Sequence, residues 1–258
     1  MNNLTNALTI YFEGCLKDLK KFWRKDDDDP NRTVARILHQ SNLVNNDLLP
    51  ILSITVNRGD LGDRIALAAT DLISCLTWPI LISEEFKELV EREEEDRVDN
   101  FEYTSFIQAQ QSYKLLIVKN KSVKHLLELL LPRLAKSRLW VDHVRWWYIL
   151  TILRERNQRD EQVIALILHT FRNILAIKDS DDHPNLHSEL IEQLHSFEIL
   201  TLFNTLASSS DSRELIPYNI IVLEIFSFLY RGVNAEELTL DPTTVSQISK
   251  IFLVADGF

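Results

Sequence analysis

The chain has 258 residues, of which 45% are hydrophobic and 26% are charged, and its formal net charge is −10. This composition supplies enough apolar side chains for a sizeable core and excludes a disordered chain. Only 5 residues are glycine, whereas β-sandwiches and nucleotide-binding α/β folds need glycine in tight turns and phosphate loops. We therefore predict an all-α protein. Its acidic balance excludes a surface that attracts nucleic acid as a whole.

In the first half of the chain, apolar residues recur at helical spacing and polar turns separate the segments. The pattern predicts helices at 4–23, 34–38, 43–56 and 61–76. The run Asp26–Asp29 with Pro30 ends the first helix as a solvated, charged turn, and Asp29 or Asn31 can cap the next helix. Pro50 removes one backbone hydrogen bond from its helix and is expected to kink it.

The second half of the chain continues in the same way. The pattern predicts helices at 106–118, 123–134, 140–153, 163–177, 186–206 (as one helix or two) and 216–230. Lys119, Asn120 and Lys121 form a polar break between two of these helices. Gly232 suits the left-handed position that often follows a helix C-terminus.

Several predicted helices are apolar on more than one side. In 163–177, Leu166 and Leu168 lie outside the main apolar stripe, and a helix of this kind is packed between neighbours. Consecutive helices with short turns are typical of stacked repeats. We predict an armadillo- or HEAT-like helical-repeat solenoid that forms a single domain over 1–258. An irregular helical bundle is the alternative, because self-similarity between units is weak.

The two cysteines, Cys15 and Cys75, are too few for a disulfide framework and lack metal-ligand spacing. Both lie in apolar helical patterns, so we expect buried free thiols in a reducing compartment. No apolar run reaches the ~20 residues that a membrane span needs. The first residues lack the pattern of a signal peptide.

Charge is distributed unevenly along the chain. Residues 83–100 contain nine acidic and three basic residues, and residues 101–158 contain ten basic and four acidic residues, which gives local net charges of −6 and +6. The acidic stretch at 84–99 is predicted to be a mobile solvated loop or a charged helix face, or else a lure for a basic partner.

No motif indicates catalysis. The chain lacks a glycine-rich phosphate loop, a nucleophile elbow and a His-Glu-x-x-His pair. The spacings His183/His187 and His187/His195 are compatible with one helix face, but no cysteine accompanies them. We predict no catalytic, cofactor-binding or metal-binding residue, and therefore a protein that is not an enzyme.

The basic middle of the chain is the candidate for a functional surface. Basic residues cluster at the two ends of the predicted helix 123–134, roughly 20 Å apart at ~1.5 Å per residue. A patch across both ends would meet several duplex phosphates. The alternative is that these side chains only solubilise the surface or face the acidic stretch. The candidates for DNA contact are Lys114, Lys119, Lys121, Lys124, Arg133, Lys136 and Arg138.

Several segments resemble one known family, in the same order along the chain. The quoted segments are Cys15-Leu16-Lys17-Asp18-Leu19-Lys20, Asn46-Asp47-Leu48-Leu49-Pro50-Ile51-Leu52, Asp71-Leu72-Ile73-Ser74-Cys75-Leu76-Thr77-Trp78-Pro79, Phe171-Arg172-Asn173-Ile174-Leu175-Ala176-Ile177 and Leu223-Glu224-Ile225-Phe226 with Arg231-Gly232-Val233. Together they resemble the N-terminal region of Timeless-family replication-fork proteins.

The resemblance implies a nuclear, non-enzymatic subunit of the fork protection complex, whose N-terminal region is a helical-repeat solenoid. It implies a Tipin-type partner, the replicative helicase, a Claspin-type checkpoint mediator and weak, non-specific contact with double-stranded DNA. No small-molecule substrate, cofactor or membrane is implied. Because family members are much longer, we expect this chain to be an N-terminal fragment.

The segments that carry the resemblance are predicted to be mostly core. Leu48, Leu72 and Ile174 are expected to pack in the interior, and Asn173 is expected to form a buried hydrogen bond between helices. A generic armadillo-like peptide adaptor is the alternative function. Such adaptors usually carry ladders of Asn and Trp at repeat spacing, whereas three tryptophans of this chain are clustered at 140–147.

Overall fold

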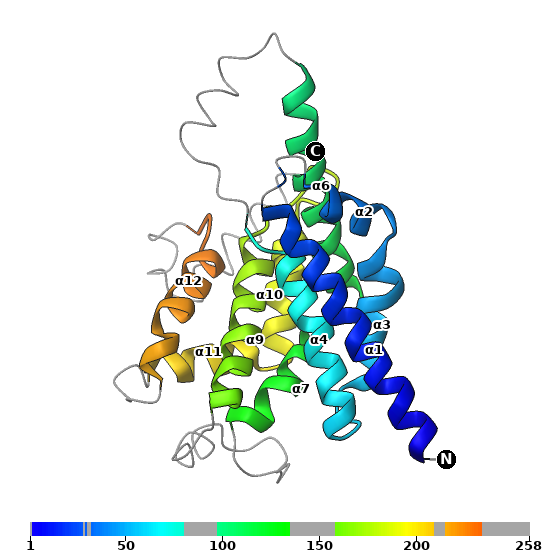
Figure 1. Ribbon diagram of the computed structural model, residues 1–258. Helices are drawn as coiled ribbons and strands as arrows, with labels where there is room; N and C mark the ends of the chain where they lie inside the picture. Colours follow the sequence, from blue (N-terminus) through cyan, green and yellow to red (C-terminus); the bar gives the residue numbers. More distant parts are fainter. Residues whose placement is uncertain are drawn as a thin grey trace.

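A computed structural model describes residues 2–27, 29, 32–79, 97–134, 158–208 and 215–233. Every regular element within these ranges is a helix (Figure 1), which confirms the all-α prediction. No helix in the described ranges is both long and apolar enough to cross a membrane. The predicted helix 140–153 and most of the acidic stretch 84–99 lie outside the described residues.

Helix positions agree with the apolar spacing of the sequence. In the first part of the chain the elements are α1 Asn2–Trp23, η1 Arg24–Asp27, α2 Thr33–Gln40, η2 Val44–Leu48, α3 Leu49–Thr55 and α4 Asp60–Leu76. In the second part they are α6 Arg97–Lys119, α7 Val123–Leu134, α9 Gln158–Ala176, α10 Leu186–Ser196, α11 Ile199–Ser208, η3 Ile216–Tyr218 and α12 Asn219–Leu229. The predicted segment 186–206 is therefore two helices, and α6 begins nine residues before the predicted start.

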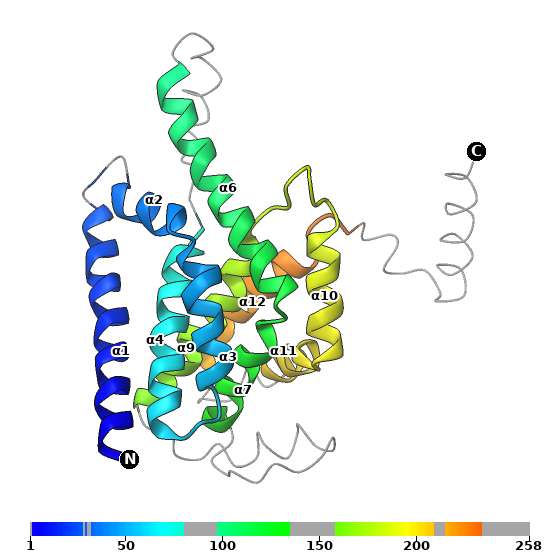
Figure 2. The same cartoon turned by 90° about the vertical axis from the view of Figure 1, so that its right-hand side faces the viewer.

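Four helices lie side by side in a row. In Figure 1 they follow one another from α1 at the right through α4 and α9 to α12 at the left, and the contacts α1–α4, α4–α9 and α9–α12 agree with this order. Helices α3, α7 and α11 pack against α4, α9 and α12 respectively. Figure 2 shows the same molecule from the side, with α1 at one edge and α10 at the other. Whether these layers are true repeats of a solenoid stays a prediction.

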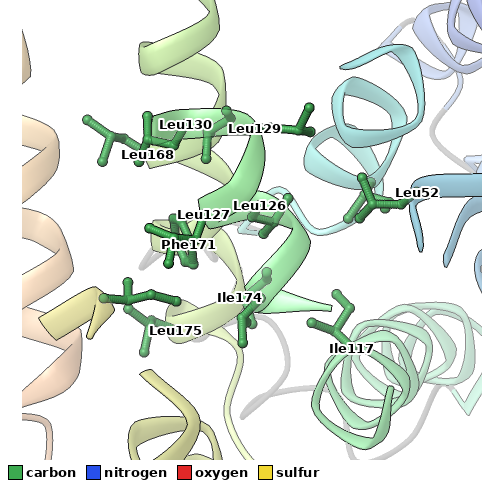
Figure 3. Close-up of a cluster of buried hydrophobic side chains, with 14 of the residues drawn as sticks. Leu52, Ile117, Leu126, Leu127, Leu129, Leu130, Leu168, Phe171, Ile174 and Leu175 are labelled. Carbon is green, nitrogen blue, oxygen red and sulfur yellow. The ribbon is translucent and has the colours of Figure 1, made fainter. Parts of the chain in front are cut away.

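The core lies where α7 and α9 pack against each other and against α4. In Figure 3, Leu130 of α7 lies beside Leu168 of α9, and Leu127 of α7 lies beside Phe171 of α9; all four side chains are buried. Their spacing places them on one face of each helix, which explains why both segments are helical and why they pack together. The turn before α7 and the connection after α9 contain the residues of the candidate site.

The predicted helix 43–56 changes its helix type just before Pro50, and a bend of its axis at this point stays a prediction. A π-helical turn occupies Val44–Leu48, in which the Leu49 N–H donates to the Val44 carbonyl, and α3 then starts with Pro50 in its first turn. A proline is tolerated there because the first N–H groups of a helix have no intrahelical acceptor. The expected irregularity is present, but it lies before the proline.

The acidic run after α1 is only partly a solvated turn. The Asp29 carboxylate accepts a hydrogen bond from the Thr33 N–H (3.0 Å), as the capping prediction requires. Asp26 is 1% exposed, and its two oxygens accept from the N–H groups of Val34 (2.9 Å) and Ala35 (2.6 Å). The prediction was wrong for Asp26, because this carboxylate satisfies the free N–H groups at the start of α2.

The cysteine prediction was also partly wrong. Cys15 is exposed and Cys75 is partly buried, and the two do not form a disulfide. Cys15 belongs to the outer face of α1, whereas Leu16 next to it is buried. An apolar pattern along α1 therefore did not identify which side faces α4.

Candidate functional site

The seven basic residues that were predicted to contact DNA do not share one environment. Lys119, Lys121 and Lys124 are exposed around the turn between α6 and α7. Lys136 and Arg138 lie outside the described residues. Contact between this turn and DNA stays a prediction, and the remaining two candidates, Lys114 and Arg133, have structural partners that are described below.

The turn between α6 and α7 is built by backbone hydrogen bonds. The N–H of Lys121 donates to the Val118 carbonyl and the N–H of Ser122 donates to the Ile117 carbonyl, both at 3.0 Å. Lys121 has a φ of 51°, in the left-handed region. This pattern is the Schellman motif, which closes a helix C-terminus. Among the described residues, the exposed lysines of the turn form one ion pair, in which the Lys124 ammonium lies 3.9 Å from the Glu128 carboxylate.

Lys114 is buried and is therefore not a surface residue that could contact DNA. Its side chain is 0% exposed, and its ammonium donates to the Asp179 carboxylate (2.6 Å) and to the Ile177 carbonyl (2.8 Å). A buried ammonium needs such partners, because an unpaired charge in the interior is strongly unfavourable. Lys114 therefore holds helix α6 to the connection between α9 and α10 and does not face a ligand in solvent.

Asp179 is the centre of a wider arrangement, which we call the Asp179 node and define as Lys114, Asp179, His187 and Arg231. The second oxygen of Asp179 accepts from the His187 N–H at 2.7 Å, which caps the start of α10. Arg231, just after α12, donates to the Ala176 carbonyl at 3.0 Å. The node thus joins α6, the end of α9, α10 and the end of α12.

Burial and charge shift the titrations of the node. Burial lowers the pKa of Lys114, while the hydrogen bond to Asp179 acts in the opposite direction. Burial also lowers the pKa of His187, and the nearby ammonium of Lys114 lowers it further. The histidine is therefore neutral at physiological pH, and the lysine depends on one carboxylate for its charge.

Arg133 also has a structural partner. It is partly buried, and its guanidinium donates to the Asp63 carboxylate at 3.2 Å and to the Leu129 carbonyl at 2.9 Å. These contacts tie α7 to the first turn of α4. Its charge is therefore already compensated, and of the described candidates only the three lysines of the α6–α7 turn have exposed side chains.

The junction between α4 and α9 confirms the prediction for Asn173. Its side chain is fully buried, and its amide N–H donates to the Ser74 carbonyl at 2.9 Å. The predicted packing residues Leu48, Leu72 and Ile174 are buried as well. The segments that carry the family resemblance therefore build the interior, and they do not by themselves mark a binding surface.

Two exposed features were missed in the sequence. Trp78, at the end of α4, is 48% exposed, and the Arg172 guanidinium lies 4.7 Å from its ring centre. On α12, Ile220 and Leu223 are 73% and 70% exposed. The apolar residues on both sides of α12 could have indicated an exposed apolar surface. The sequence alone does not show which of the two sides is covered by a neighbouring helix.

No metal centre emerges from the described part of the chain, where no three His, Cys, Asp or Glu side chains are placed to hold an ion. Of the three histidines with helical spacing, His187 is partly buried and belongs to the Asp179 node, whereas His183 and His195 are exposed.

Comparison with known proteins identifies the family. The pattern of the Timeless protein family matches residues 8–250. The chain belongs to the Timeless family. A relative named Topoisomerase 1-associated factor 1, from Cryptococcus neoformans var. neoformans serotype D, is 40% identical over 243 residues, which are 90% of this chain and 21% of the relative. Proteins of the same name from Phaeosphaeria nodorum and Aspergillus fumigatus are 31% and 29% identical, each over 88% of this chain and 18% of the relative.

The match confirms the resemblance that was inferred from the quoted segments. This Timeless-family chain spans about a fifth of the length of these relatives. The family match covers all five of the quoted segments, which lie in or beside α1, α3, α4, α9 and α12. What the whole relatives do is therefore a matter for proposal.

Proposed function

We propose that this chain is a non-enzymatic scaffold of the replication fork protection complex. In this role it binds a Tipin-type subunit, the replicative helicase and a Claspin-type checkpoint mediator in the nucleus, and it supports fork stability, fork pausing and the replication checkpoint. The observation that carries the proposal is the Timeless-family match over residues 8–250. The name of the relatives adds topoisomerase 1 to the partners that should be sought.

A pull-down from replicating cells tests this proposal. The tagged 258-residue chain is expected to recover a Tipin-type subunit, helicase components or topoisomerase 1, and to recover less from cells arrested before replication. Recovery of cytoplasmic peptide-bearing proteins alone, equally from both cell populations, would support the alternative of an armadillo-like peptide adaptor and contradict the proposal.

Contact with duplex DNA is the second part of the proposal. It rests on Lys119, Lys121 and Lys124, whose exposed ammonium groups surround one rigid turn. Lys136 and Arg138 remain candidates on sequence grounds. Exposed lysines attract phosphates without sequence preference, and each phosphate contact steepens the fall of affinity with salt.

The DNA test compares two double variants of equal charge change. Lys121→Glu/Lys124→Glu is expected to lower affinity for a labelled duplex and to reduce the slope of log affinity against log salt by about two. The matched control is Lys17→Glu/Lys21→Glu on α1, where both lysines are exposed but pair with Glu13 and Asp18. Equal losses in the two variants would show that only net charge matters and would exclude the turn as a contact site.

A further inference from the structure

The Asp179 node brings together four segments that are distant in the sequence. Lys114 comes from α6, Asp179 from the connection after α9, His187 from the first turn of α10, and Arg231 from the residues after α12. The node contains two basic side chains, Lys114 and Arg231, and a single carboxylate. Both oxygens of that carboxylate are already used, one by the Lys114 ammonium at 2.6 Å and the other by the His187 backbone N–H at 2.7 Å.

The imidazole of His187 closes the node toward α12. Burial and the Lys114 ammonium lower the pKa of the ring, and the nearby backbone of Leu229, the last residue of α12, opposes them as the smallest effect. The Nε2 atom of His187 is buried and has no hydrogen-bond partner among the described residues. The charged groups that act on the ring are Lys114, Asp179 and Arg231. A proton on Nε2 would place a third positive charge beside one occupied carboxylate, and its N–H would lack an acceptor.

We propose that the Asp179 node is an acid-sensitive clamp. When His187 is neutral, the clamp holds the end of α12 against the end of α9, and the α9–α10 connection against α6. When His187 is protonated, the clamp opens, because the protonated ring is stable only where water can reach it. The inference concerns the fold of this chain and does not depend on the proposed role at replication forks.

The electrostatics agree with this geometry. Burial lowers the pKa of His187, the ammonium of Lys114 lowers it further, and the Asp179 carboxylate opposes these effects. A base whose pKa is lowered in the closed state binds its proton more readily in the open state. Opening is therefore favoured as the pH falls below the ordinary histidine pKa of about 6.5.

Amide hydrogen exchange of the intact chain tests the clamp between about pH 7.5 and about pH 5.5, after correction for intrinsic exchange rates. In the wild type, the protection of α12 and of residues 177–187 is expected to fall by up to about tenfold per pH unit below about pH 6.5. His187→Gln, which keeps a neutral polar side chain, should lose this pH dependence. His195→Gln is the matched control, since His195 lies on the same helix but is exposed, and it should behave as the wild type.

Two results would overturn the clamp: a pH-independent α12 in the wild type, or a wild-type pH dependence in His187→Gln. If His187→Gln does not fold, the ring resonances of the histidines in the wild-type chain decide the matter by NMR titration. The clamp requires His187 to titrate below the ordinary histidine pKa of about 6.5, with α12 amide signals shifting at the same midpoint. A His187 midpoint at or above that value, or α12 signals that do not follow it, contradicts the clamp.

Discussion

The lysines in and just after helix α6 are of two kinds, which differ in burial and in bonding partners. Lys114 is fully buried and bonded to Asp179, whereas Lys119, the last residue of α6, and Lys121, in the turn that follows, are exposed. Lys114 shares its side of α6 with the buried residues Ile117 and Val118, while the other two follow the point where the helix stops packing. The sum of charges along a sequence therefore does not give the charge of a surface.

The largest expected effect comes from removing the buried member of this comparison. Lys114→Ala leaves the Asp179 carboxylate in the interior without its cation, and breaking a buried pair in this way costs about 3–5 kcal/mol of unfolding free energy. Urea unfolding followed by circular dichroism measures the loss. The control is Lys119→Ala, where the side chain is exposed and a change within about 0.5 kcal/mol is expected. Similar losses in the two variants would show that Lys114 is not a structural residue.

Asn173 is buried but uncharged, so a comparison of its substitution with that of Lys114 separates the contribution of charge to stability from that of burial. Asn173→Ala removes the hydrogen bond between α9 and the Ser74 carbonyl and leaves that buried carbonyl without this donor. The expected loss is about 1–3 kcal/mol, below that of Lys114→Ala, because no charge is left uncompensated. The same unfolding experiment measures it. A loss larger than that of Lys114→Ala would mean that the α4–α9 junction, not the Asp179 node, is the more sensitive point of the interior.

The helices were predictable because each depends on local spacing of apolar residues and on turn chemistry. The segments 61–76 and 163–177 were found nearly in full as α4 and α9, and the buried role of Asn173 followed from its place within an apolar helix. The roles of Lys114 and Asp26 could not be predicted. Their partners, Asp179 and the N–H groups of α2, are brought to them by tertiary packing that no local pattern reports.

The candidate site was predicted only in part for the same reason. Exposure of Lys119, Lys121 and Lys124 followed from their position at a polar break between helices. The compensation of Arg133 by Asp63 depends on contact between α7 and α4, which are 47 residues apart at their nearest ends. Sequence identified the basic segment, and the fold decided which of its charges remain available.

A histidine outside the Asp179 node tests whether acid sensitivity belongs to the node alone. Burial lowers the pKa of His39, whose ring packs edge-on against Tyr113 at 5.4 Å. Its neutral form is favoured in the folded state, so its contribution is complete above about pH 6.5 and is lost as the pH falls below that value. The contribution is less than about 1 kcal/mol, because the ring is partly exposed.

His39→Phe keeps the aromatic contact and removes the titration. Between about pH 7 and about pH 5, its unfolding free energy should fall slightly less than that of the wild type, while most of the acid dependence remains. Thermal unfolding at a series of pH values measures the difference. If His39→Phe abolished the acid dependence altogether, the Asp179 node would have no special role in it.

The smallest expected effect concerns the exposed member of the comparison. Lys121 occupies the left-handed position of the Schellman motif with a φ of 51°, which costs a residue with a side chain more than it costs glycine. Among the described residues, no ion pair involves its ammonium, and its side chain is exposed. Replacing Lys121 with glycine removes the backbone strain of the left-handed position but increases the conformational entropy of the unfolded chain. The unfolding free energy of Lys121→Gly should therefore rise by no more than about 0.5 kcal/mol.

The same substitution should weaken DNA binding slightly, because one exposed ammonium is removed while the turn is kept. Lys121→Ala serves as the control: it removes the same charge but leaves a β-carbon in the left-handed region, so it should bind DNA as Lys121→Gly does and be the less stable of the two. Chemical unfolding and duplex titration on both variants separate the two roles. A loss of stability in Lys121→Gly as large as that in Lys114→Ala would contradict the distinction between a structural lysine within α6 and a surface lysine in the turn after it. The α6–α7 turn would then have to be regarded as part of the core.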